Sequence, residues 1–298
     1  MTLDQIQLFR DLAQTKSVSK AAQLNSVSQS AASQHLRELE RQFETSLVDR
    51  STRPLGLTEA GRLYADFCRH VMSVRHEFDV GLERLKGTVE GLVRVCSIYS
   101  VGLSEMAGLE RAFAQRYPSA HLQVDYLRPE KVYEAVRQDR ADLGLVSYPE
   151  QSKDIQAIPW RDEIMVVALA PGHPLAGAAV LSPADLRGRN FVGFDDDLPV
   201  SRDVARFLRD ANVTVKVVMH FDNIETMKQA VALDEGLSIL PARILRPDIE
   251  QGRLRAVPLS PGLSRPLGIL HLRRKKLNRA TQSFLNLLRE APENGAPA

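Results

Sequence analysis

The chain has 298 residues, of which 44% are hydrophobic and 26% charged, so it is long enough for about two globular domains. Its 39 basic and 37 acidic residues nearly cancel, and the first ninety residues carry 12 of each sign. Bulk charge therefore identifies no nucleic-acid-binding domain, and any such surface must come from local placement of side chains. Two cysteines exclude a disulfide framework and a cysteine-rich metal site.

The chain also lacks the patterns of secreted and membrane proteins. Its start, MTLDQIQLFRDLAQ, contains acids and no long apolar core, which excludes a signal peptide. No apolar run approaches the roughly 20 residues that are needed to span a bilayer. We therefore expect a cytoplasmic protein without membrane contact.

Three helices are predicted near the beginning of the chain. Apolar residues at helical spacing predict the first helix over 3–15. A serine can cap a short second helix that ends near Leu24, and the asparagine and serine that follow suit a tight turn. The third helix is expected over about 28–43.

The third predicted helix has two contrasting faces. Ala32, Leu36 and Leu39 form an apolar stripe that suits a core. The opposite face carries short polar side chains and then arginines, namely Ser30, Ser33, Gln34, Arg37 and Arg41, with Gln29 beside them. Serine and glutamine can hydrogen-bond base edges in a DNA major groove, and the absence of carboxylates avoids repulsion by phosphates. The alternative is a surface helix that is polar for no functional reason.

A small hairpin and a long helix are expected next. Residues 46–61 have short apolar pieces around a proline and a glycine, which indicates a wing whose Arg50 and Arg53 can meet phosphates or a minor groove. A helix over 59–86 would be roughly 40 Å long. It carries a heptad-like apolar seam of Tyr64, Phe67, Val71, Val74, Phe78, Gly81 and Leu85. This seam favours pairing with a second helix over packing on the same chain.

From Gly91 onward, apolar strands alternate with amphipathic helices, which predicts parallel α/β units. The first set of strands is expected at 92–98, 121–127 and 142–146, and the second at 163–170, 190–194, 214–221 and 237–241. A last strand over 267–272 and a last helix over 278–289 are expected to return to the first unit. Two lobes result, lobe I over about 89–160 and 265–290 and lobe II over about 161–264, with a ligand cleft between them.

The segment over 16–61, KSVSKAAQLNSVSQSAASQHLRELERQFETSLVDRSTRPLGLTEAG, resembles the winged helix-turn-helix of LysR-type transcriptional regulators. The later FDNIETMKQAVALDEGLSILP resembles the second lobe of that family. The family often has proline where this chain has Ser30 and arginine where it has Gln34, so Gln34 is expected to change which bases are read.

The resemblance implies a DNA-binding dimer that usually assembles into a tetramer and contacts RNA polymerase. It also implies an effector domain like periplasmic binding proteins, with a small inducer in the cleft. The expected fold is therefore α + α/β: a winged helix-turn-helix over 1–58, a linker and dimerisation helix over 59–88, and a two-lobed effector-binding domain over 89–298.

The resemblance implies that effector contacts come from the loop after the first strand of lobe I and from positions that face it across the cleft. The candidates are Tyr99, Ser100, Val101, Arg128, Ser147, Ser201 and Arg202. Hydroxyl groups and the N–H groups of helix starts favour negative charge, and arginines add charge-assisted hydrogen bonds. The sequence therefore predicts a small anionic effector. The alternative is that each serine only caps a helix and each arginine is solvated.

No catalytic or cofactor-binding motif stands out, since GxxxxGK[ST], GxGxxG and HExxH are all absent. The carboxylates over 195–197 could hold a cation or serve as acid and base, but a solvated loop or a helix-capping acid is the preferred interpretation. The alternative function is an enzyme or solute receptor whose N-terminal helices only oligomerise. We expect a ligand-responsive transcription factor without enzymatic activity, cofactor or metal.

Overall fold

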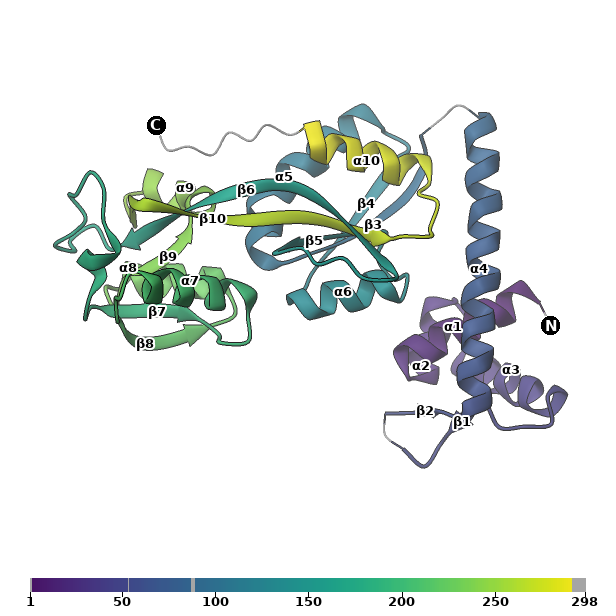
Figure 1. Ribbon diagram of the computed structural model, residues 1–298. Helices are drawn as coiled ribbons and strands as arrows, with labels where there is room; N and C mark the ends of the chain where they lie inside the picture. The colour runs from purple at the N-terminus through teal and green to yellow at the C-terminus, as the bar shows by residue number, and fades with distance from the viewer. Residues whose placement is uncertain (1, 53, 87–88, 291–298) are drawn as a thin grey trace. The chain divides into compact units, whose positions relative to one another are not determined.

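The computed structural model describes residues 2–52, 54–86 and 89–290, which fall into two compact units, Met1–Thr88 and Val89–Ala298 (Figure 1). Each unit has its own hydrophobic core, and the second unit has one core in each of two lobes. No described helix is long and apolar enough to cross a membrane.

The first unit is a winged helix-turn-helix followed by a long helix. Its elements are α1 (Leu3–Thr15), α2 (Val18–Leu24), α3 (Gln29–Gln42), β1 (Val48–Asp49), β2 (Gly56–Leu57) and α4 (Glu59–Lys86). The side chains of Thr2, Ser17 and Ser28 each accept a hydrogen bond from a backbone N–H in the first turn of α1, α2 and α3. The predicted helices and hairpin are confirmed.

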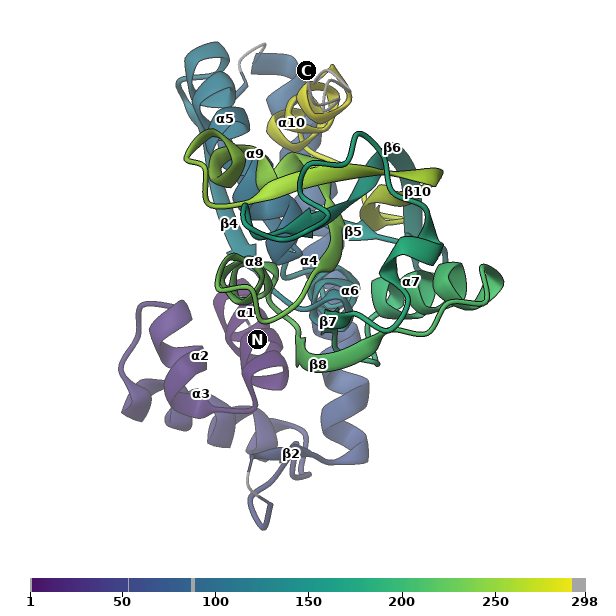
Figure 2. The same ribbon diagram turned by 90° about the vertical axis from the view of Figure 1, so that its left-hand side faces the viewer.

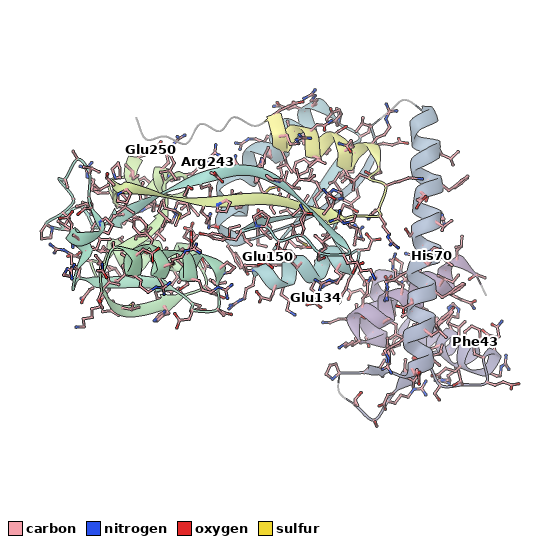
Figure 3. All side chains as sticks on the ribbon, viewed as in Figure 1. Phe43, His70, Glu134, Glu150, Arg243 and Glu250 are labelled. Carbon is pink, nitrogen blue, oxygen red and sulfur yellow. The ribbon has the colours of Figure 1, made fainter. Side chains whose placement is uncertain are left out.

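The core of the first unit joins the three short helices to the beginning of α4. The Tyr64 ring of α4 lies 4.8 Å from that of Phe9 and 5.1 Å from that of Phe43, measured between centroids. Figure 3 shows Phe43 at the end of α3, next to α4. Glycine is needed at position 61, because a Cβ there would lie 1.8 Å from the Leu47 carbonyl oxygen. The wing and α4 are therefore closely packed.

The predicted helix-pairing seam was wrong at Tyr64, because this side chain is buried in the core of its own chain. The exposed apolar stripe of α4 instead runs through Leu63, Phe67, Val74 and Phe78, which are 42–74% exposed. The side chain of Leu85 lies outside the described part of the chain. Since apolar side chains this exposed are unusual on a helix that functions alone, the stripe remains available for a partner.

The second unit is built on a mixed six-stranded sheet of order β4-β3-β5-β10-β6-β9, which extends through both lobes. Lobe I contains β3 (Gly91–Ser97), α5 (Tyr99–Arg116), β4 (Ala120–Tyr126), α6 (Pro129–Arg137), β5 (Leu143–Ser147) and α10 (Arg279–Glu290). Lobe II contains η1 (Pro183–Leu186), β7 (Asn190–Phe194), α7 (Pro199–Asp210), β8 (Lys216–Phe221), α8 (Ile224–Ala232), β9 (Ser238–Pro241) and α9 (Ala242–Glu250). The two-lobed α/β fold is confirmed.

Two long antiparallel strands, β6 (Ile155–Leu169) and β10 (Arg255–Leu272), connect the lobes and run side by side (Figures 1 and 2). The sequence predicted shorter strands over 163–170 and 267–272, and this was wrong. Charged and proline residues inside the two segments hid their continuity, and two of the charged residues, Glu163 and Arg265, pair with each other within the sheet. Helix α9 was not predicted, because Pro247 interrupts its helical pattern.

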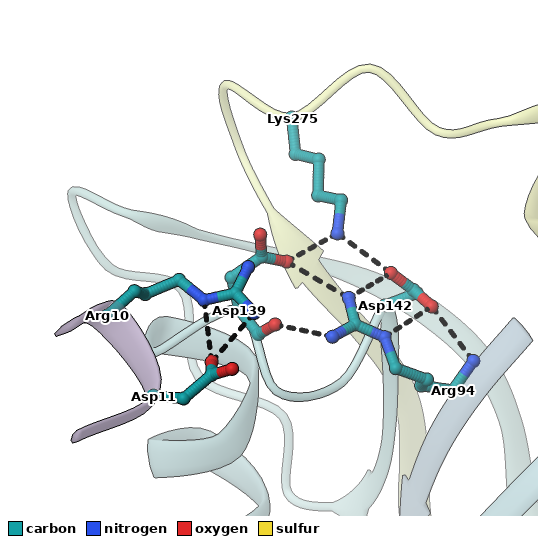
Figure 4. Close-up of polar contacts among 6 residues, drawn as sticks. All are labelled: Arg10, Asp11, Arg94, Asp139, Asp142 and Lys275. Carbon is teal, nitrogen blue, oxygen red and sulfur yellow. Dashed lines mark hydrogen bonds and ion pairs between the residues drawn. The ribbon is translucent and has the colours of Figure 1, made fainter. Parts of the chain in front are cut away.

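A buried ion-pair cluster holds β3, β5 and β10 of lobe I together (Figure 4). Asp142 accepts a hydrogen bond from the Arg94 backbone N–H at 2.8 Å and forms an ion pair with Lys275 at 2.7 Å. Burial by itself would raise the pKa of Asp142, but the hydrogen bonds from Arg94 and the charge of Lys275 hold it well below its usual range. Asp139 completes the cluster by accepting from Arg94 through its backbone carbonyl at 2.8 Å. We assign this cluster a structural role.

Candidate functional site

One face of α3 is hollowed and polar. It is lined by Gln29, Ser30, Ser33, Gln34 and Arg37, whereas Arg41, which was predicted for the same face, does not line it. Ser28 accepts from the Ala31 N–H at 3.1 Å and lies 2.9 Å from the Ser30 hydroxyl, so the first turn is fixed in place. The amide and guanidinium groups of Gln34 and Arg37 are exposed. The face therefore presents hydrogen-bonding groups on a rigid helix whose apolar side is in the core.

The wing residue Arg50 is partly exposed but has a partner on α3. Its guanidinium forms an ion pair with Glu40 at 2.9 Å, and the same carboxylate accepts from the Leu47 N–H at 2.9 Å. This arrangement fixes the direction in which the wing leaves α3. The predicted phosphate contact of Arg50 stays a prediction, and Arg53 lies outside the described residues.

In the second unit, four of the predicted effector residues line one cavity between the lobes. Tyr99, Ser100, Arg128 and Ser147 form part of its wall from lobe I, and the starts of α7 and α8 form part of it from lobe II. The cavity has a volume of about 40 Å³, room for only a few water molecules.

The other three predicted effector residues do not line this cavity. Val101 is fully buried in the core of lobe I. The Ser201 hydroxyl donates to the Phe194 carbonyl oxygen at 3.2 Å, and the Arg202 side chain is exposed to solvent. The sequence correctly predicted that a helix begins here, but it could not show which side chains of the first turn face inward.

Several helices begin at the cavity. The N-cap residues of α5, α6 and α7 are Ile98, Arg128 and Leu198, and none of them forms a side-chain cap hydrogen bond. The start of α8 also lines the cavity and is capped by Asn223, which accepts from the Glu225 N–H at 2.8 Å. Helix starts carry partial positive charge, and their N–H groups favour anions. Their convergence directs several helix N-termini toward the cavity, an arrangement that favours an anion.

Arg265 of β10 is a cavity residue that the sequence did not reveal. It is only 2% exposed and pairs with Glu163, its register partner on β6. Its Nη1 donates to the Ser100 Oγ at 3.1 Å. The strand was predicted to begin only at residue 267, so Arg265 was not recognised as part of β10.

Arg128 lines the cavity and contacts three carboxylates of lobe II. Its guanidinium lies 2.6 Å from Asp197, 3.2 Å from Asp222 and 3.8 Å from Asp195. The carboxylates over 195–197 were interpreted as a solvated loop or helix-capping acids. The side chains of Asp196 and Asp197 are exposed, at 91% and 69%, but Asp195 and Asp197 also pair with Arg128.

Other reactive groups in the described part of the chain form no site. No group of three or more His, Cys, Asp and Glu side chains among the described residues could hold a metal ion. Both thiols are buried, and burial raises the pKa of Cys68 and of Cys96 to about 11.

Comparison with known proteins agrees with this division of the chain. Residues 3–62 match the family described as bacterial regulatory helix-turn-helix protein, lysR family, and residues 86–293 match the LysR substrate binding domain. The RuBisCO operon transcriptional regulator of Allochromatium vinosum is 29% identical over 95% of this chain and 94% of its own length.

Solved structures show the same fold. A full-length OxyR variant from Pseudomonas aeruginosa superposes with a TM-score of 0.77 at 21% identity, covering 97% of this chain and 95% of that one. The CcmR regulatory domain of Synechocystis, solved in complex with 2-PG, has a TM-score of 0.62 at 24% identity, covering 69% of this chain and 99% of that one.

Proposed function

The chain belongs to the LysR family of transcriptional regulators, and we propose that it reads promoter DNA with α3 and responds to a small anionic effector in the interlobe cavity. The proposal that α3 reads DNA rests on its hollowed face. The first turn of α3 is capped, Gln34 and Arg37 are exposed on this face, and the opposite side packs in the core. Since this DNA lies in the cytoplasm, we infer that the protein acts there.

Two substitutions on α3 distinguish base reading from phosphate binding. We expect Gln34→Ala to lower affinity for the specific operator by roughly 1–3 kcal/mol while leaving non-specific binding unchanged. We expect Arg37→Ala to weaken binding to all sequences and to reduce the salt dependence by about one counterion. The measurement is fluorescence anisotropy with DNA from upstream of the gene, at several salt concentrations.

Gln42→Ala is the matched control, because Gln42 is exposed on the same helix and does not line the hollowed face. Equal losses from Gln34→Ala and Gln42→Ala would show that α3 does not read bases through this face.

We further propose that the exposed stripe of α4 pairs two copies of the chain, that dimers assemble into tetramers, and that the bound assembly contacts RNA polymerase. The support is that Leu63, Phe67, Val74 and Phe78, spaced 4, 7 and 4 residues apart, fall on one side of α4 and leave apolar area exposed on the described chain. Pairing delivers two α3 faces to an operator of partial two-fold symmetry.

The proposed effector is a small anion. Converging helix starts, the hydroxyls of Ser100 and Ser147, and the guanidinium of Arg128 all favour negative charge in the cavity. The related CcmR domain was solved with 2-PG, which makes 2-PG a reasonable first probe. Isothermal titration of the wild type and of Ser100→Ala tests this, and unchanged affinity in the variant would count against the site.

The alternative function is an enzyme that acts on a small acid in the same cavity. The family consists of transcriptional regulators, and we propose that this chain has no catalytic activity. Turnover of a bound acid by the purified protein, without any selective DNA binding, would favour the enzyme.

A further inference from the structure

Ion pairs beside the cavity join the two lobes. Arg128 lies at the start of α6 in lobe I, while Asp195 and Asp197 follow β7 and Asp222 follows β8 in lobe II. The shortest contact joins Arg128 Nη2 to the Asp197 carboxylate at 2.6 Å. These ion pairs cross from one lobe to the other, so they resist separation of the lobes. We call Arg128, Asp197 and Asp222 the latch.

The latch and the candidate effector site share residues. Arg128 and Asp222 both line the cavity, whose volume of about 40 Å³ is too small for more than a few water molecules. A larger anion therefore needs a rearrangement of the side chains or of the lobes around the cavity. Any anion that reaches Arg128 also meets the carboxylates that already hold it.

The latch can exchange partners more easily than the buried ion pair between Arg265 and Glu163. The side chains of Arg265 and Glu163 are 2% and 5% exposed, so separating them leaves a buried charge without a partner. The side chains of Arg128 and Asp197 are 31% and 69% exposed, so water can solvate the displaced carboxylate. An incoming anion can therefore displace the carboxylates from Arg128 more easily than it can displace Glu163 from Arg265.

We propose that Asp197 and Asp222 compete with the effector for Arg128, so that effector binding and release of the latch are one linked event. The inference rests on the proposed anionic effector and adds its regulation. The aspartates set a threshold, because a weakly charged or neutral molecule cannot displace them. Since the latch joins the lobes, its release changes their relative placement, and only a ligand that prefers the released arrangement shifts the equilibrium.

The test compares the wild type with Asp197→Asn, Asp222→Asn, the double variant and the control Asp196→Asn. Asp196 stands in the same loop and has a highly exposed carboxylate that lies 3.9 Å from His220 Nδ1 and is not part of the latch. The probes are 2-PG and inorganic phosphate, used separately, so that an organic acid is distinguished from a simple ion. Affinity is measured by isothermal titration of the full-length protein.

Each single latch variant should bind the probe about two- to fivefold more tightly, and the double variant roughly tenfold, because exposed ion pairs contribute little individually. The control should match the wild type. Without ligand, hydrogen exchange over 127–131 and 195–198 should be faster in the double variant and unchanged in the control.

The outcomes separate the latch from the proposed effector class. If the wild type binds a probe and the double variant binds it equally or more weakly, competition is refuted while the anionic effector stands. If only the double variant binds, the latch is supported. If no form binds either probe, the anionic effector and the competition are both contradicted, and unchanged exchange in the double variant would also exclude the latch.

Discussion

The ion pair between Glu163 and Arg265 should be strongly coupled to the stability of the second unit. The two residues are register partners on β6 and β10, and Arg265 Nε donates to the Glu163 carboxylate at 3.1 Å. With side chains 5% and 2% exposed, neither charge can be solvated in place if the other is removed. We expect Glu163→Gln to lower the free energy of unfolding by about 3–5 kcal/mol.

Arg265→Met should cost a similar amount, because it leaves the Glu163 carboxylate buried and without its cation. The double variant Glu163→Gln/Arg265→Met removes both charges and should be more stable than the sum of the single effects by about 2–3 kcal/mol. This non-additivity identifies the cost as that of an unpaired charge rather than a lost contact.

Urea unfolding of the full-length variants, followed by tryptophan fluorescence, measures these energies. Trp160 is the single tryptophan of the chain, and its Nε1 donates to the Leu288 carbonyl oxygen at 2.7 Å, so the signal reports on the second unit. Asp196→Asn is the exposed control and should change stability by less than about 0.5 kcal/mol. Additive single effects, or a loss below about 1 kcal/mol for Glu163→Gln, would refute the reasoning.

Three further predictions concern other parts of the chain. Phe78→Ser should shift the protein from dimer to monomer in sedimentation velocity, because it removes an exposed apolar group from the α4 stripe; an unchanged dimer would assign pairing elsewhere. Asp142→Asn should destabilise the second unit by about 3 kcal/mol in urea unfolding. Because the pKa of Asp142 is lowered in the folded wild type, its contribution to stability is complete above the ordinary pKa of 3.8 and is lost as the pH falls further. Acid unfolding measures this loss, and equal acid sensitivity of the variant and the wild type would contradict the prediction. Cys68 and Cys96 should resist iodoacetamide at pH 8 in the native protein and react in denaturant, because burial raises the pKa of each thiol to about 11; mass spectrometry that finds either one alkylated in the native state would contradict this.

The sequence by itself determined the helices of the first unit and the face of α3. Helical periodicity is a local property, and the apolar stripe of Ala32, Leu36 and Leu39 fixes which side of α3 turns inward. The polar face with Gln34 then follows by geometry. The two-lobed α/β organisation was also predictable, since alternating strands and helices leave their periods in the chain.

Only the tertiary structure decided which side chains meet. Tyr64 matched the predicted seam of α4 equally well, but its ring contacts Phe9 and Phe43 and so belongs to the core. Arg265 reaches Ser100 across 165 positions of sequence, and Arg128 reaches Asp197 across 69. Periodicity carries no information about contacts between residues far apart in sequence, because an ion pair depends on how strands and loops are brought together in space. The cavity likewise exists only where these distant segments converge.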